Sequence, residues 1–68
     1  MKSFGQNLKS LREQCGINQQ ELADKIGTTQ PRVSEWENDK VEPTLYNIIR
    51  IVDTLRVSFE DLTEDVTA

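Results

Sequence analysis

Few side chains in this chain could perform catalysis or bind a metal ion. The sequence has no histidine, which removes the commonest general base and the commonest metal ligand together. Twelve aspartates and glutamates remain, but they are spread along charged segments, as is typical of a solvated surface rather than of paired catalytic carboxylates. We therefore expect a protein that is not an enzyme and that binds no metal ion and no cofactor.

Cys15 is the only cysteine, and it lies between Gln14 and Gly16 at the end of a predicted helix. Two interpretations are open, a reactive thiol or a small, partly buried apolar residue, and we favour the second. A single cysteine also excludes a disulfide within the chain.

The length and composition predict one small domain over residues 1–68. A chain of this size buries only about 60% of its unfolded surface, so dimerisation would add stability. No apolar run exceeds two residues, and the N-terminal Met1-Lys2-Ser3-Phe4 lacks the apolar stretch of a signal peptide. We expect a cytoplasmic protein with no membrane segment.

The formal net charge of −4 is unevenly distributed along the chain. Residues 1–40 hold six basic and six acidic side chains, whereas residues 41–68 hold two basic and six acidic ones. The N-terminal part is therefore neutral, and the acidity lies in the C-terminal part. Phosphate contacts supply much of a protein's affinity for DNA, so a neutral N-terminal part is a weak electrostatic platform for binding it.

Apolar side chains recur at helical spacing and predict five short helices with no strand, so the expected fold class is all-α. Each predicted helix begins after a residue type that caps helices well. These residues are Ser3, Asn18, Thr29, Thr44 and Ser58. Capping-box partners follow three residues later at Gln6, Glu21 and Asp61. Gly16 and Gly27 can supply left-handed ends for the first two helices.

The inner faces of the helices follow from the same spacing. For the first three, we expect burial of Phe4, Leu8, Leu11, Leu22, Ala23, Ile26, Val33 and Trp36. For the fourth, we expect burial of Leu45, Ile48, Ile49, Val52 and Leu55. The fifth carries Phe59 and Leu62, and the chain is expected to fray from Glu64.

The second and third predicted helices form a candidate helix-turn-helix over about residues 19–38. Ala23 is small where the helices must cross, and Gly27 permits a positive φ at the turn. Val33 and Trp36 anchor the third helix from beneath and leave its N-terminal end projecting. A helix held in this way fits the DNA major groove, which is about 12 Å wide.

Residues 17–27, with the sequence INQQELADKIG, resemble the second helix of the Cro/repressor-type (XRE-type) helix-turn-helix family. The resemblance continues through Thr28-Thr29-Gln30, Val33, Trp36-Glu37-Asn38, Lys40, Pro43-Thr44-Leu45 and residues 48–55 and 57–62. It covers about residues 4–62 and implies a five-helix, lambda-repressor-like domain that binds a double-stranded DNA operator.

The resemblance assigns roles to individual positions. It implies base reading in the major groove by Gln30, Pro31, Arg32 and Glu35. Glutamine can pair with adenine, arginine with guanine or a phosphate, and glutamate with a cytosine amine. Proline offers only apolar contact. The positions implied to contact the DNA backbone are Asn18, Gln19, Thr28, Thr29, Asn38 and Lys40. Arg12 and Glu37 match a buried, structural ion pair of some relatives.

Three positions depart from the family pattern. Pro31 stands where the family usually has a residue that hydrogen-bonds to a base. Fewer direct hydrogen bonds are therefore available for recognising the DNA sequence. Asp39 stands where glycine is common, and aspartate adopts the left-handed conformation at some cost. Arg56 replaces a usual glycine or asparagine. The sequence of the DNA operator therefore cannot be predicted from these residues.

One module covers about half a site, so we expect a homodimer on a near-palindrome with half-site centres about 34–36 Å apart. The expected contact surface is the junction of the fourth and fifth helices, at Ile51, Val57 and Phe59. The alternative is that these three residues belong to the monomer core.

Two classes of function fit these observations. The first is a small dimeric transcription repressor of phage, plasmid or mobile-element type, or a restriction–modification control protein, whose activity a protein partner could govern. The second is a protein-interaction module, such as an antitoxin, that retains the fold with weak DNA binding. The acidic C-terminal part suits the second class.

Overall fold

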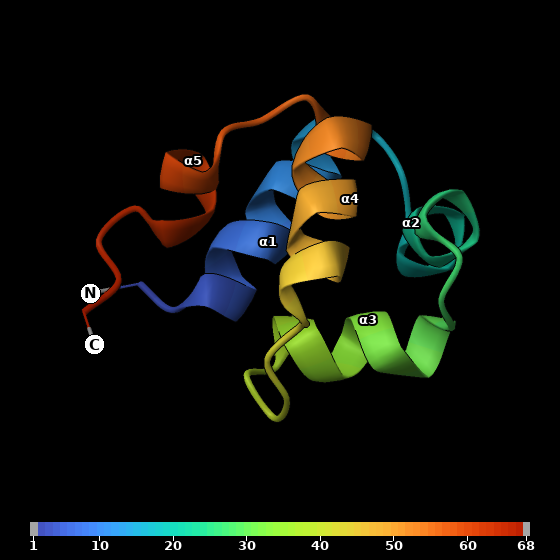
Figure 1. Cartoon of the computed structure of the whole chain (residues 1–68), viewed down its shortest axis with the longest axis horizontal. Helices are drawn as coiled ribbons and strands as arrows, with labels where there is room; N and C mark the ends of the chain where they lie inside the picture. The colour runs from blue at the N-terminus through green and yellow to red at the C-terminus, as the bar shows by residue number, and fades with distance from the viewer. Residues whose placement is uncertain (1, 68) are drawn as a thin grey trace.

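The computed structural model describes residues 2–67 and contains five α-helices joined by short loops (Figure 1). They are α1 (Phe4–Gln14), α2 (Gln19–Ile26), α3 (Gln30–Glu37), α4 (Leu45–Leu55) and α5 (Phe59–Thr63). No strand occurs within residues 2–67, and the predicted all-α class is confirmed. α3 lies along one edge of the molecule with α2 at its N-terminal end, and α5 lies on the opposite side from α2 (Figure 1).

Each helix begins at its predicted capping residue. The Ser3 hydroxyl accepts a hydrogen bond from the Gln6 N–H, and the Gln6 side chain accepts one from the Ser3 N–H, at 3.1 and 2.9 Å. The same reciprocal arrangement caps α2 and α5. Thr29 and Thr44 cap α3 and α4 through their hydroxyl oxygens. Because these caps pair backbone N–H groups that the helix leaves unsatisfied, local sequence determines where each helix starts.

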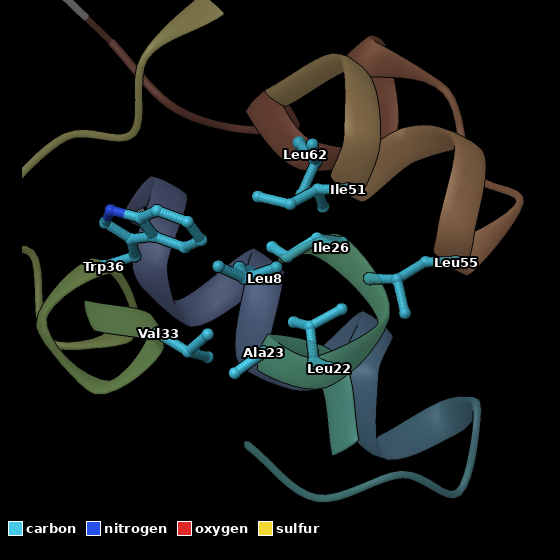
Figure 2. Close-up of a cluster of buried hydrophobic side chains, with 9 residues drawn as sticks. All are labelled: Leu8, Leu22, Ala23, Ile26, Val33, Trp36, Ile51, Leu55 and Leu62. Atoms are coloured by element: carbon cyan, nitrogen blue, oxygen red, sulfur yellow. The ribbon is translucent and has the colours of Figure 1, made fainter. Parts of the chain in front are cut away.

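The core is one cluster to which all five helices contribute side chains (Figure 2). Its members are Leu8, Leu22, Ala23, Ile26, Val33, Trp36, Ile51, Leu55 and Leu62. Trp36 is the largest, and it lies at the end of the cluster formed by α1 and α3 (Figure 2). Because Val33 and Trp36 both point into this cluster, the opposite side of α3 is left facing solvent.

The inner face of α4 differs from the prediction at three positions. Leu45 is 68% exposed and Ile49 is 52% exposed, so their predicted burial is wrong. Ile51, which was not expected on the inner face, is fully buried. The apolar residues of α4 cover more than half of its circumference, and packing in the shared core buries Ile51 and Leu55.

The prediction for Cys15 is also wrong, because this residue is exposed rather than partly buried. Its Sγ contacts the Leu55 carbonyl oxygen at 3.5 Å. Cys15 is the C-cap residue of α1, directly before Gly16, which has φ 74°.

Two contacts of α1 that sequence reasoning missed hold it against α3 and α5. Gly5 packs so closely on the C-terminal end of α3 that an added Cβ would lie 2.6 Å from the Trp36 carbonyl oxygen. The buried Asn7 donates hydrogen bonds to the carbonyl oxygens of Leu62 and Glu64, at 3.0 and 2.8 Å. The signal for Gly5 was present in the sequence, since an isolated glycine within a helical pattern often marks close packing.

Candidate nucleic-acid interface

α2 and α3 form a helix-turn-helix whose turn depends on two small residues. Gly27 has φ 79°, in the left-handed region that favours glycine. The N–H groups of Gly27 and Thr28 both donate to the Ala23 carbonyl oxygen at 2.9 Å. Ala23 is fully buried. The pair begins at Gln19 and ends at the cap residue Asn38, in agreement with the predicted limits of residues 19–38.

The predicted reading face of α3 lies on the surface of the molecule. Pro31, Arg32 and Glu35 are exposed, and Gln30 is half-buried. Within residues 2–67, the side chains of Arg32 and Glu35 make no hydrogen bond and no ion pair, so their polar groups are available to a ligand. Pro31 occupies the second helical position, where the missing N–H removes no intrahelical bond.

A series of hydrogen bonds joins this face to the interior, and we call it the amide relay (Arg12, Glu37, Gln19 and Gln30). Nε2 of Gln30 donates to Oε1 of Gln19 at 2.7 Å, and Nε2 of Gln19 donates to Oε1 of Glu37 at 3.0 Å. Arg12 donates to both carboxylate oxygens of Glu37, at 2.6 and 3.0 Å. The predicted Arg12–Glu37 ion pair is therefore present, and it extends to two of the predicted DNA-contacting residues.

The ion pair fixes α1 against α3 in the interior. Arg12 is 7% exposed and Glu37 is 6% exposed. Arg12 also donates to the Ile17 carbonyl oxygen at 2.8 Å, so its guanidinium is bonded on several sides. The hydrogen bond to Glu37 raises the pKa of Arg12 above its ordinary value, against the opposing effect of burial. Its positive charge is consequently permanent under the conditions in which proteins fold and bind.

The N-terminus of α2 presents donors suited to an anion. Asn18 and Glu21 cap each other's backbone N–H groups at 2.8 and 2.9 Å. Within residues 2–67, no hydrogen bond uses the backbone N–H of Gln19 or Gln20. Free N–H groups at a helix N-terminus, together with the helix dipole, are the features that bind phosphate. The Gln19 side chain lies at the same end of α2 and touches Gln30.

The other residues predicted to contact the DNA backbone surround α3. Thr28 and Thr29 precede it, with Thr28 half-buried and Thr29 exposed. Asn38 and Lys40 follow it and are exposed. The Asn38 amide donates to the Ser34 carbonyl oxygen at 2.9 Å, so part of its donor capacity is used within the protein. These four residues therefore lie at the two ends of α3.

One of the three residues predicted for a dimer contact is excluded. Ile51 is fully buried in the core of the single chain, so the prediction for Ile51 is wrong. Val57 is half-buried and packs against the core, whereas Phe59 is 55% exposed. Leu45 and Ile49 add exposed apolar surface on α4. Phe59 also borders a hollow of about 490 Å³ whose apolar lining includes Phe4, Val41, Pro43, Ile48 and Val66.

Residues 8–62 match the helix-turn-helix family, which is most of the chain. The chain belongs to the Cro/repressor-type helix-turn-helix family. This family consists of DNA-binding transcription regulators, and the resemblance seen in the sequence is confirmed. No helix within residues 2–67 is both long enough and apolar enough to cross a membrane.

Two similar proteins illustrate the range of the family. The HTH-type transcriptional regulator YqaE of Bacillus subtilis (strain 168) is 39% identical over 59 residues, covering 87% of this chain and 51% of that protein. Antitoxin HipB of Escherichia coli (strain K12) is 39% identical over 51 residues, covering 75% of this chain and 58% of that protein. The chain thus spans little more than half the length of these curated relatives.

Solved structures with the same fold include the P22 c2 repressor in complex with a synthetic operator. That chain superposes with a TM-score of 0.86 at 24% identity, covering 91% of this chain and 94% of the repressor chain. A solution structure of the same repressor's DNA-binding domain gives a TM-score of 0.85 at 24% identity, covering 97% of this chain and 88% of that one. The lambda-repressor-like arrangement of the five helices is therefore confirmed.

Proposed function

We propose that this protein is a sequence-specific regulator of transcription that binds double-stranded DNA as a dimer and acts as a small repressor. The observation that carries the proposal is the outward face of α3, on which Arg32 and Glu35 are exposed and the half-buried Gln30 contacts Gln19 at the N-terminus of α2. Groups that could pair with base edges and a helix end that could bind phosphate thus lie close together, as binding in the major groove would require. A DNA target would place the protein in the cytoplasm with the nucleoid.

The roles proposed for the reading residues follow from their hydrogen-bonding groups. Arg32 can donate two bonds to the O6 and N7 atoms of guanine, and Glu35 can accept from the N4 amine of cytosine. Gln30 can bond the N6 and N7 atoms of adenine. Each such contact would contribute about 1–3 kcal/mol of discrimination against the wrong base. Gln19, Asn18 and the ends of α3 would hold the phosphates that fix the register.

The proposed dimer uses the exposed apolar surface of α4 and α5. Leu45, Ile49 and Phe59 are each more than half exposed, so these large apolar side chains are available for a contact between two chains. A two-fold contact through this surface would repeat the reading helix at a neighbouring half-site, about one DNA turn away. It would also bury apolar area that the small core cannot cover. The whole chain, residues 1–68, would then be one DNA-binding unit of the dimer.

A second candidate function is a toxin-binding antitoxin with weak DNA affinity. The observations that favour it are the likeness to antitoxin HipB and the net charge of −4, which comes from residues 41–68. The acidic side chains of residues 41–68 would suit a basic protein partner. Such a partner could also govern a repressor, so the two functions share a surface but differ in DNA affinity.

Selection of DNA from a random duplex pool by the purified protein tests the proposal directly. A recovered consensus with two-fold symmetry supports a dimeric, sequence-specific regulator. Binding is then measured against salt concentration, because a protein that contacts several phosphates loses about 10³- to 10⁵-fold in affinity between 50 and 200 mM salt. No enriched sequence and no retained duplex at low salt would reject DNA reading and favour the antitoxin.

A further inference from the structure

The direction of each hydrogen bond in the amide relay is determined at its buried end. A guanidinium group can only donate hydrogen bonds and a carboxylate can only accept them. Oε1 of Glu37 accepts from Arg12 and from Nε2 of Gln19, both at 3.0 Å. If the Gln19 amide were turned round, its carbonyl oxygen would face the carboxylate oxygen, and two acceptors would meet with no proton between them. The orientation of the Gln19 amide is therefore fixed.

The same constraint passes from Gln19 to the reading face. Because Nε2 of Gln19 faces Glu37, its Oε1 faces Gln30 and can only accept. Gln30 must therefore donate, and its Nε2 donates to Oε1 of Gln19 at 2.7 Å. The groups of Gln30 left for a ligand are one N–H of Nε2 and the carbonyl oxygen Oε1. Amide orientations in proteins are generally assigned from such partners, and here the assignment rests on two groups that cannot change roles.

We propose that the buried Arg12–Glu37 pair sets the base preference of Gln30 by fixing, through Gln19, which way the Gln30 amide faces. One free donor beside one free acceptor matches adenine, which accepts at N7 and donates from N6 in the major groove. Guanine presents two acceptors there, N7 and O6, and one of them would oppose the Gln30 carbonyl oxygen. The reversed amide would instead offer two donors and favour guanine.

This inference rests on the proposed function, since it takes Gln30 as a base reader. It assigns Arg12 and Glu37 as positioning residues for specificity, because neither side chain reaches the DNA-facing surface. It also gives the half-buried Gln19 a second task beside phosphate contact. A residue that only contacts phosphate changes affinity for all sequences equally, whereas a residue of the amide relay changes the ratio between sequences.

The decisive variant is Gln19→Lys. The lysine ammonium can donate to Glu37, but it offers no acceptor to Gln30, so Gln30 has to present its carbonyl oxygen inward and both N–H groups outward. The base pair read by Gln30 is first identified as the one at which Gln30→Ala loses discrimination. Binding is then measured to two duplexes that differ only at that base pair, one with adenine and one with guanine. Wild type is expected to prefer adenine by about 5- to 150-fold, and Gln19→Lys is expected to prefer guanine.

Gln20→Lys is the matched control. Gln20 is the next residue of α2, it is exposed, and its amide bonds only the neighbouring Asp24 at 2.8 Å. This variant adds the same charge beside the DNA without touching the amide relay. It is expected to strengthen binding to both duplexes and to leave the adenine-to-guanine ratio as in wild type. A third variant, Gln19→Met, keeps the bulk but breaks the relay, and its ratio is expected to fall toward unity.

A measurement without DNA tests the relay independently of the proposed function. In wild type, the side-chain NH₂ of Gln30 is held by Gln19, so its heteronuclear NOE is expected to resemble that of ordered backbone. In Gln19→Met it is expected to fall to the value of an exposed amide, whereas Gln20→Met leaves it unchanged. The same spectra show that each variant is folded.

The outcomes separate the two proposals. If wild type binds no duplex selectively while the Gln30 amide is ordered, DNA reading fails and the base-preference inference fails with it, but the relay as a structural device stands. If wild type prefers adenine and Gln19→Lys keeps that preference, the inference is overturned and the proposed function is intact. If Gln19→Lys switches its preference to guanine and Gln20→Lys does not, the result supports both the proposed function and the inference.

Discussion

The backbone N–H of Gly5, in the first turn of α1, donates a 2.9 Å hydrogen bond to the side-chain carboxylate of Asp39, in the loop after α3. Asp39 has φ 58°, so it holds the left-handed conformation that the family pattern usually gives to glycine. The cost of that conformation for a side-chain-bearing residue, about 1–2 kcal/mol, is offset in part by a bond that glycine could not make. This contact joins the start of α1 to the loop that follows α3 and so helps to hold the two helices together.

Gly5→Ala is expected to destabilise the protein by about 1–3 kcal/mol, as overpacking of a tight contact does. A methyl group would meet the carbonyl oxygens of Glu37 and Trp36, which belong to backbone that cannot turn aside. Urea denaturation measures the loss. Ser10→Ala, at an exposed position of the same helix, is the control and is expected to be neutral or slightly stabilising. Equal stability of the two variants would contradict the close packing.

Arg56→Gly is expected to stabilise the protein by up to about 1.5 kcal/mol. Arg56 ends α4 with φ 55°, and glycine removes the left-handed strain of about 1–2 kcal/mol while adding about 0.5–1 kcal/mol of unfolded-state entropy. The expected rise in Tm is therefore a few degrees. Arg50→Gly removes the same charge from the interior of α4 and is expected to cost about 1 kcal/mol. A fall in Tm for both variants would show that Arg56 is not strained.

Arg32→Ala is expected to weaken binding to the operator more than binding to random DNA, by about 1–3 kcal/mol. The reason is that its exposed guanidinium is assigned to a base. Gln19→Ala is expected to weaken both, because it removes a proposed phosphate contact, and to weaken operator binding more, because Gln30 also loses the partner that orients it. Competition binding at one salt concentration measures the two affinities, and Arg50→Ala serves as the charge control on α4. Equal losses at operator and random DNA for Arg32→Ala would make it a phosphate contact, and the salt slope would then fall by about one.

Substitutions of two isoleucines of α4 are expected to change folding stability by very different amounts. Ile51→Ala removes a fully buried side chain and is expected to cost about 2–5 kcal/mol of folding stability. Ile49→Ser changes a side chain that is 52% exposed and is expected to leave monomer stability within about 0.5 kcal/mol.

The proposed dimer surface predicts that Ile49→Ser and Phe59→Ser weaken self-association. Sedimentation measurements across a concentration series give the dimer dissociation constant. Cooperative operator binding is expected to weaken in parallel, because the dimer links the two half-sites. An unchanged dissociation constant in both variants would place the dimer contact elsewhere on the protein.

The starts of the five helices and the ends of α1 and α2 could be predicted from the sequence alone. Capping residues such as Asn18 and Thr29 act on backbone groups within three residues, so the starts of α2 and α3 need no tertiary information. Gly27 likewise ends α2 because its backbone can adopt a positive φ. Small residues and anchors at fixed spacing, among them Ala23 and Trp36, then predicted which face of α3 would point inward.

The tertiary structure decided what depends on distant partners. α4 has apolar residues on most of its surface, so periodicity could not tell the buried Ile51 from the exposed Ile49, and only the neighbouring helices make that distinction. The contact of Gly5 with Asp39 spans 34 positions. The amide relay likewise needs α1, α2 and α3 in place before Arg12 can orient Gln19. Which amide group donates and which accepts depends on partners that folding brings together, so a local sequence pattern cannot predict it.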